Sequence, residues 1–217
     1  MNIRQHIREF LLDKINPTVF ELGVHWGEDT KNILNWCQGT ANYHGFEPDK
    51  RSLKKISAEW ETTMPKNLTI IEGAISDKDG TTTLYLSDGI HSLNGLRMTG
   101  ANSIRKPYEV LKKHSWIDFS QTTTVKTYTI DTYCKNQNIN KIDFIWSDIQ
   151  GCEYDMLLGA KEMLPNIGIM LLEYSEIELY KGQGSLKDML NLLGNDWELI
   201  GKDSWDIIVR NKKYNND

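Results

Sequence analysis

The stretch TVFELGVHWG, residues 18–27, decides the fold class of this 217-residue chain. Its first five residues are mostly apolar or β-branched, which predicts a short buried strand. Gly23 follows directly and predicts a tight turn, and residues 28–38 then carry apolar side chains at helical spacing until Gly39. A strand that passes through a glycine turn into a helix is the first unit of an alternating α/β fold.

The alternation continues on both sides of this stretch. Upstream, residues 3–16 have apolar side chains on one face and predict an amphipathic helix that Pro17 closes. Downstream, the predicted elements are strands at 43–47, 68–75, 142–147 and 168–174, helices at 49–62, 131–138 and 153–164, a helix that begins at Ser185, and β-rich runs at 81–86 and 123–130. Strands that alternate with helices predict a parallel sheet with crossover connections.

The last two predicted strands, residues 197–200 and 206–209, are separated by only a few polar residues. Such a short connection cannot hold a crossover helix, so this pair is predicted to be antiparallel. The chain shows no linker and no internal repeat. The predicted organisation is an N-terminal helix in residues 1–17 followed by one α/β domain in residues 18–217.

Composition narrows the function classes. The formal charge is -5, from 25 Lys and Arg against 30 Asp and Glu, which argues against a broad nucleic-acid-binding face. No apolar run is long enough to span a membrane, and the N-terminus lacks the apolar core of a signal peptide. The three cysteines have no zinc-type spacing and no disulfide framework, which predicts a reducing, cytoplasmic location.

The glycine turn predicts a ligand site. The spacing Glu21-x-Gly23-x-x-x-Gly27 is not the dinucleotide fingerprint, so a pyrophosphate is not the expected ligand. An acid before such a turn suits a ligand with positive charge, and S-adenosylmethionine (SAM) carries a sulfonium and an ammonium group. His25 is bulky for this loop and is predicted to shape the methionine pocket. Glu47 ends the next strand, where an acid commonly binds ribose hydroxyls.

A more specific pattern lies at residues 143–159, DFIWSDIQGCEYDMLLG. In this stretch a predicted strand ends in Asp-apolar-Glu/Gln-Gly-x-Glu, and the helix that follows contains Leu-x-Gly-Ala. This pattern resembles that of the FkbM family of SAM-dependent methyltransferases. Further matches are residues 73–80, 129–131, 173 and 180–183, and the likeness runs from about Val19 to Arg210. Two positions depart from it, because many relatives have Lys in place of Trp146 and Glu in place of Gln150.

The resemblance implies a fold and an activity. The fold would be a Rossmann-like three-layer sandwich with a mainly parallel seven-stranded sheet, and the two β-rich runs would be its extra strands. The activity would be methyl transfer from SAM to a hydroxyl of a sugar, polysaccharide or natural product, with Ala74 and Ile75 among the cofactor-binding residues. The two departures leave open a non-catalytic nucleoside-binding module with the same fold. A nucleic-acid methyltransferase is a further alternative, but the chain lacks its Asn/Asp-Pro-Pro-aromatic type of motif.

A hydroxyl acceptor is a poor nucleophile, so a general base is expected at the carboxyl ends of the strands. The candidates are Asp148, which is also predicted to contact the cofactor, Glu173 at the end of the next strand, and His91. Ser92 is predicted to contact SAM or the acceptor. Asp148 could alternatively be a helix N-cap. A metal ion on Asp148 and Glu173 would need a third ligand, and none is evident, so no metal site is predicted.

The irregular segment 88–121 is the predicted lid or acceptor loop, because loops this long are usually functional. It holds five basic residues, Arg97, Arg105, Lys106, Lys112 and Lys113, and three acidic ones, Asp88, Glu109 and Asp118. Its net charge is therefore +2, and the rest of the chain carries -7. This bias predicts an anionic small-molecule or glycan acceptor, while a solvated surface loop is the plainer alternative.

Overall fold

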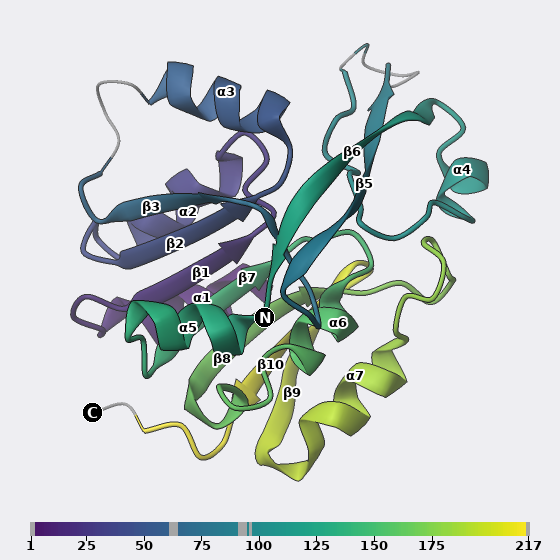
Figure 1. The fold of residues 1–217 in the computed structure, drawn as a ribbon. Coiled ribbons are helices and arrows are strands. Elements are labelled where there is room, and N and C mark those ends of the chain that lie inside the picture. Colours follow the sequence, from purple (N-terminus) through teal and green to yellow (C-terminus); the bar gives the residue numbers. More distant parts are fainter. Residues whose placement is uncertain (1–2, 61–64, 91–94, 96, 216–217) are drawn as a thin grey trace.

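A seven-stranded sheet forms the centre of the computed structural model, which describes residues 3–60, 65–90, 95 and 97–215 (Figure 1). Its strands are β1 (Thr18–Leu22), β2 (Asn42–Glu47), β3 (Leu68–Glu72), β7 (Ile142–Ser147), β8 (Ile167–Glu173), β9 (Trp197–Lys202) and β10 (Asp206–Asn211). They lie in the order β3-β2-β1-β7-β8-β10-β9. The first five are parallel, whereas β10 is antiparallel to both β8 and β9. The predicted sheet and its C-terminal hairpin are confirmed.

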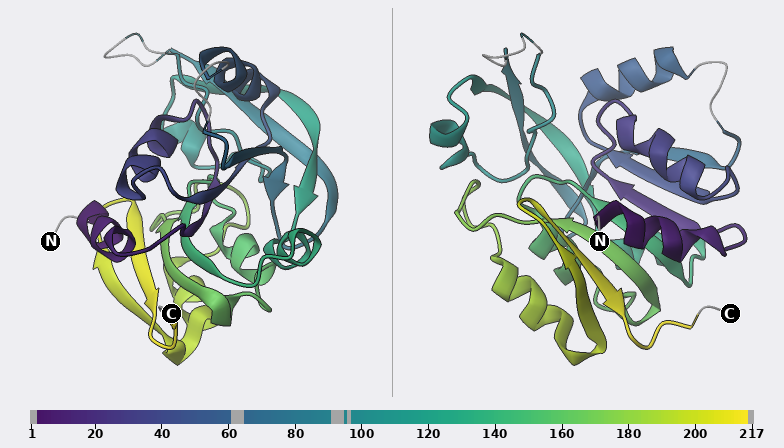
Figure 2. Two further views of the ribbon diagram at one scale, coloured as in Figure 1. Left: turned by 90° about the vertical axis from the view of Figure 1, so that its left-hand side faces the viewer. Right: turned by 180° about the vertical axis from the view of Figure 1, so that it is seen from behind.

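Helices cover both faces of this sheet, and the structure is the predicted three-layer sandwich (Figure 2). One face carries α1 (Ile3–Leu12), α2 (Glu28–Trp36) and α3 (Lys50–Glu59), and the other carries α5 (Ile130–Gln137), α6 (Glu153–Leu158) and α7 (Leu186–Leu193). Side chains of a strand point alternately to the two faces. On β1, Val19 therefore packs with the first group, while Phe20 and Leu22 pack with the second.

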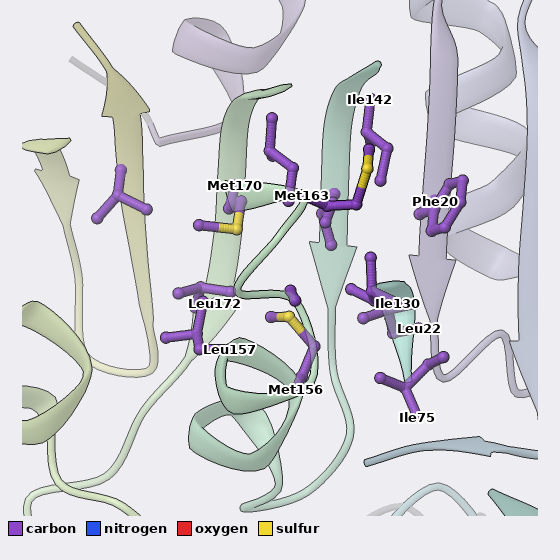
Figure 3. Close-up of a cluster of buried hydrophobic side chains, with 14 of the residues drawn as sticks. Phe20, Leu22, Ile75, Ile130, Ile142, Met156, Leu157, Met163, Met170 and Leu172 are labelled. Atoms are coloured by element: carbon purple, nitrogen blue, oxygen red, sulfur yellow. The ribbon is translucent and has the colours of Figure 1, made fainter. Parts of the chain in front are cut away.

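The core beneath α5, α6 and α7 is shown in part in Figure 3. Met156 and Leu157 of α6 pack in the same cluster as Met170 and Leu172 of β8, and all four are fully buried. Each such side chain contributes about 1.5–3 kcal/mol of hydrophobic free energy. Because β1, β7 and β8 are apolar towards both layers, their carboxyl ends are held in fixed positions.

A second, three-stranded sheet rises beside the first (Figure 1) and has the order β4-β6-β5. Its strands are β4 (Ala74–Ile75), β5 (Gly80–Gly89) and β6 (Ile117–Tyr128). The single strand predicted at 68–75 is wrong, because Gly73 divides it between the two sheets. Gly73 has φ +153°, and a Cβ there would lie 2.5 Å from the Tyr128 ring. The chain can therefore turn into the second sheet only at a glycine.

The extra strands are longer than predicted, so the irregular segment is shorter than 88–121. Residues 88 and 89 belong to β5 and residues 117–121 to β6, and a short helix, α4 (Val110–Lys113), lies between them. The helix predicted at 153–164 is also too long. It ends before Gly159, where a Cβ would lie 2.3 Å from the Ser76 carbonyl oxygen. Two short 3₁₀ helices, η1 (Leu164–Asn166) and η2 (Gly194–Asp196), complete the elements.

The start of α7 follows the sequence closely. Ser185 is its N-cap, the Ser185 hydroxyl accepts from the Asp188 amide, and the Asp188 carboxylate accepts from the Ser185 amide. The helix therefore begins with the reciprocal capping box that the Ser-x-x-Asp spacing predicts. Among the described residues, every helix is too short or too polar to span a bilayer.

Candidate active site

A cavity of about 260 Å³ opens at the carboxyl edge of the sheet, above the neighbouring strands β1 and β7. Strand order reverses between these two strands, and ligands of open α/β sheets bind at such a switch point. The lining residues are Glu21, Gly23, Val24, His25, Glu28, Asp29, Phe46, Glu47, Pro48, Gly73, Ala74, Ile75, Leu84, Gly100, Asn102, Ile104, Asp148, Ile149 and Cys152. They include every predicted cofactor-binding residue except Gly27.

The lining of this cavity is acidic. Its carboxyl groups come from Glu21, Glu28, Asp29, Glu47 and Asp148, and none of the described lining residues is a lysine or an arginine. A concave site with one sign of charge attracts ligands of the opposite sign. The cavity therefore suits a cationic ligand of nucleoside size and disfavours a pyrophosphate.

Glu47 connects the glycine turn to the end of β2. Its carboxylate accepts hydrogen bonds from the backbone amides of His25 and Asp49, both at 2.7 Å. Burial raises the pKa of Glu47 to about 8, and these two hydrogen bonds oppose the rise. A carboxylate oxygen can accept more than one hydrogen bond, so Glu47 keeps acceptor capacity towards the cavity.

Glu21 points from β1 towards α2 and is 1% exposed. One of its oxygens accepts from both the Thr30 hydroxyl and the Tyr43 hydroxyl. Burial raises the pKa of Glu21 to about 8, against the lowering effect of both hydroxyls. The acid before the glycine turn is thus fastened to α2 and β2 as well as lining the cavity.

These two glutamates make the free energy of unfolding depend on pH. In the unfolded chain they release their protons near pH 4.5, whereas in the folded chain they release them near pH 8. The folded state therefore binds more protons within that window, and stability falls as pH rises through it. Each group contributes a slope of up to about 1.4 kcal/mol per pH unit.

We expect Glu21→Gln to flatten this pH dependence. Glutamine keeps one oxygen for Thr30 and Tyr43 but has no proton to lose, so its stability curve should fall less between pH 5 and pH 8. Urea unfolding midpoints across that range provide the measurement, with the exposed Glu162→Gln as the matched control. Identical slopes for Glu21→Gln and wild type would contradict the assignment.

His25 joins the glycine turn to the segment that follows β5. Its ring stacks on Trp26 with centroids 4.4 Å apart, and its Nε2 lies 3.0 Å from the Thr99 hydroxyl. Burial lowers the pKa of His25, although nearby Glu28 opposes this. The neutral imidazole forms a wall of the cavity at the place predicted for the methionine end of the ligand.

The segment between β5 and β6 forms part of the cavity wall through Gly100, Asn102 and Ile104. The Asn102 amide nitrogen donates to Asp49, and its oxygen accepts from the Ser87 amide at 2.7 Å. Three of the basic side chains that predicted an anionic acceptor are engaged within the chain. Arg97 pairs with Asp88, Arg105 with Asp155 and Lys112 with Glu109. Most of the positive charge is therefore not directed at an acceptor.

Asp148 follows β7 and extends into the cavity, where its side chain is exposed. It is not the N-cap of α6, because Cys152 occupies that position. Glu173 ends β8 and does not line the cavity. It lies behind Asp148, and the Gln150 amide donates to both carboxyl groups, at 2.6 Å to Asp148 and 3.0 Å to Glu173.

The matching family model is that of the methyltransferase FkbM domain, and it covers residues 10–201. The chain belongs to the FkbM methyltransferase family. The predicted methyltransferase activity and Rossmann-like fold are confirmed. This FkbM methyltransferase is 32% identical over 208 residues to the 2-O-methyltransferase NoeI of Sinorhizobium fredii. The aligned region covers 94% of this chain and 83% of NoeI.

Solved structures share its fold. An FkbM methyltransferase from Methylobacillus flagellatus superposes with a TM-score of 0.52 and 16% identity, over 90% of this chain and 43% of that one. This chain therefore spans less than half of that protein. The N-terminal domain of EvdMO1, solved in the presence of S-adenosylhomocysteine and D-fucose, gives a TM-score of 0.51 and 11% identity over 95% and 80% of the two chains.

Two residues of the FkbM site received no role from the sequence. Glu153 is 3% exposed, and its carboxylate accepts from the amides of Ile149 and Gly151, so it fixes the loop that carries Asp148. Tyr180 is 2% exposed and donates to the side-chain oxygen of Gln150. Both lie in stretches that match the family pattern, but only their folded contacts reveal what they do.

The remaining predictions for this FkbM methyltransferase concern His91, Ser92, a metal site and Gly27. His91 and Ser92 lie outside the described residues. Within the described part of the chain, no group of three His, Cys, Asp or Glu side chains is placed to hold a metal ion. Gly27 is the N-cap of α2, and a Cβ there would face the Trp60 ring at 3.0 Å.

Proposed function

We propose that this FkbM methyltransferase uses SAM to methylate a hydroxyl group of a sugar or glycan. The observation that carries the cofactor assignment is the acidic cavity at the switch point between β1 and β7. When bound, SAM supplies a methyl group already activated on a positively charged sulfur, which retains the electron pair of the broken C–S bond.

Different lining residues of the cavity suit different parts of SAM. Glu47 at the end of β2 is the ribose-binding candidate, and Ala74 and Ile75 offer apolar surface to the adenine. The turn at Gly23 would receive the methionine carboxylate. The acidic lining as a whole suits the ammonium and sulfonium charges, and none of the described lining residues is a lysine or an arginine.

An oxygen acceptor is supported by the 32% identity to NoeI, whose name specifies 2-O-methyl transfer. As the new O–C bond forms, the acceptor hydroxyl must release its proton. Asp148 is the candidate base for this proton, because its carboxylate faces the cavity and Glu173 lies behind it. The proposed acceptor class is a sugar or glycan. Arg97, Arg105 and Lys112 are paired with acidic side chains of the same chain, which disfavours an anionic acceptor.

Calorimetric titration of the protein with SAM, S-adenosylhomocysteine and NAD tests the cofactor assignment. We expect both sulfur nucleosides to bind and NAD not to bind. A panel of hexoses, deoxyhexoses and oligosaccharides with methyl-labelled SAM then tests the acceptor class. Tighter binding of NAD would replace the proposal with hydride transfer, and binding of SAM without transfer to any hydroxyl would favour a non-catalytic module.

Replacing Glu47 with alanine is expected to weaken SAM binding about tenfold to hundredfold. The measurement is made above pH 8, where Glu47 is ionised, so the variant loses charge-assisted hydrogen bonds to the ribose, worth roughly 1.5–3 kcal/mol. The matched control is Glu72→Ala. Glu72 ends β3 and lies opposite Glu47 in the register of β2 and β3, but it is exposed and lies outside the cavity lining. Equal affinities for Glu47→Ala and Glu72→Ala would place the ribose elsewhere.

A further inference from the structure

A chain of hydrogen-bonded side chains lies behind Asp148, and the function proposed above leaves most of it unexplained. Tyr180, in the loop after β8, donates to the Gln150 side-chain oxygen at 2.8 Å. Gln150, in the loop after β7, donates from its nitrogen to Asp148 and Glu173. Groups from two strand ends and one loop therefore converge on the side-chain amide of Gln150.

The chemistry of the amide fixes its orientation. Its nitrogen has two hydrogens, one for each carboxyl group, and its oxygen accepts the Tyr180 hydroxyl. The reversed amide would place its oxygen against the ionised Asp148 carboxylate and would leave the Tyr180 hydroxyl facing an N–H group. The backbone also restricts Gln150, which has φ +53° and precedes Gly151 with φ +89°. A left-handed conformation at a non-glycine residue is held only by strong local contacts, which Glu153 supplies to the flanking amides.

We infer that Gln150, oriented by Tyr180, is a positioning residue that holds the Asp148 carboxylate towards the acceptor and the Glu173 carboxyl group behind it. The inference rests on the proposed function, because Asp148 is the base of that reaction. When the acceptor O–H bond breaks, its proton moves to Asp148, and Glu173 and Gln150 keep their own hydrogens. Gln150 and Tyr180 act through Asp148 and touch no reacting atom.

The electrostatic surroundings support this division of roles. Burial raises the pKa of Glu173 well above its ordinary value, and the Asp148 charge raises it further. The surrounding protein also raises the pKa of Asp148, but hydrogen bonds from Gln150 and Glu173 oppose this. Asp148 is the exposed member of the pair and Glu173 the half-buried one, so the proton remains on Glu173. The other titratable groups that interact with the pair are His25, Glu47, Asp29, Glu153, Tyr180 and Asp206.

The same hydrogen-bonded side chains also contact the segment between β5 and β6 that forms part of the cavity wall. The Tyr180 hydroxyl lies 3.1 Å from the Ala101 carbonyl oxygen, and the Ser103 hydroxyl donates to the Gln150 carbonyl oxygen at 2.8 Å. Gln150 is therefore fixed through both its side chain and its backbone. The base and the wall of the cavity share one set of contacts.

The test uses Gln150→Met and Tyr180→Phe, which keep side-chain volume and remove the hydrogen bonds. Tyr174→Phe is the control for the tyrosine. The Tyr174 hydroxyl donates to the Asp203 carbonyl oxygen at 2.8 Å and makes no hydrogen bond to Gln150, Asp148 or Glu173. Gln38→Met is the control for the glutamine, because Gln38 has φ +52° on the surface. The first readout is the carboxyl ¹³C titration of Asp148 in the protein without ligand, assigned through Asp148→Asn.

We expect the Asp148 titration to move to higher pH in Gln150→Met and Tyr180→Phe and to stay unchanged in both controls. With the acceptor identified by the sugar panel, kcat should fall about 10²-fold in Gln150→Met with an unchanged KM for SAM. Its pH profile should shift upward with the titration. An unmoved Asp148 titration in Gln150→Met overturns the inference.

The two proposals fail in different ways. If the wild type methylates no sugar, the proposed function fails, while the titration in the ligand-free protein still decides the role of Gln150. If methyl transfer is confirmed and Gln150→Met turns over at the wild-type rate, the proposed function stands and the positioning role is refuted.

Discussion

Asp148→Asn is expected to reduce methyl transfer by about 10²–10⁴-fold while SAM affinity stays within a few-fold of wild type. Asparagine keeps the size of the side chain but loses the negative charge that would accept the acceptor proton. The hydrogen bond from Gln150 survives, because an amide oxygen can replace the carboxylate oxygen that accepts it at 2.6 Å. The cofactor contacts proposed for Glu47 and the glycine turn are on other strands and should be unaffected.

Single-turnover rates and SAM titrations of the same preparation separate the two effects. A role as base would appear as loss of the acidic limb of the pH profile of kcat, whereas a metal role would add a dependence on Mg²⁺ that a chelator abolishes. Glu173→Gln is the matched comparison and should retain more activity, because Glu173 lies outside the cavity lining. Near wild-type transfer by Asp148→Asn would remove Asp148 as the base and leave His91 and Glu173 as the remaining candidates.

Gly23→Ala is expected to lower the free energy of unfolding by about 3 kcal/mol or more and to abolish SAM binding. Gly23 has φ +86°, which costs an alanine about 1–2 kcal/mol. A Cβ at Gly23 would also lie 2.0 Å from the carbonyl oxygen of Asp148. Backbone atoms cannot move aside as a side chain can, so β1 and the loop after β7 would have to separate.

Gly27→Ala is the matched control for this experiment. Gly27 has φ +82°, so the backbone cost is similar, but its Cβ would meet only the edge of the Trp60 ring at 3.0 Å. The difference between the two variants in chemical unfolding therefore isolates the overlap with the Asp148 carbonyl. Equal stability of the two variants would mean that the turn and the Asp148 loop can adjust independently.

The regular parts of the fold were predictable because their causes are local. Residues 142–147 and 168–173 are mostly apolar, since both sides of each strand are buried beneath helices. The Ser185-x-x-Asp188 spacing likewise contains the capping box that starts α7. The predicted bounds were wrong near Gly73 and Gly159. At Gly73 and Gly159 only a glycine fits, because the neighbouring Tyr128 ring and Ser76 carbonyl oxygen come too close for a Cβ.

The candidate site was predictable only in its outline. Glu21, Glu47 and Asp148 lie at or near the ends of parallel strands, and the carboxyl ends of such strands meet at one edge. The direction of the basic side chains was not predictable. Arg105 is 50 residues from Asp155 in the chain, and only the packing of the segment after β5 against α6 pairs them.

The sequence by itself determined the alternating strands and helices, the antiparallel end of the sheet and the family, because these depend on the order and period of residues along the chain. The tertiary structure alone decided that Glu173 lies behind Asp148, that Tyr180 orients Gln150 and that Gly23 contacts the Asp148 carbonyl. The physical reason is that a carboxyl pair, an oriented amide and a close backbone approach depend on distances of about 3 Å between residues far apart in sequence. Such distances are set only when β1, β7 and β8 are packed side by side.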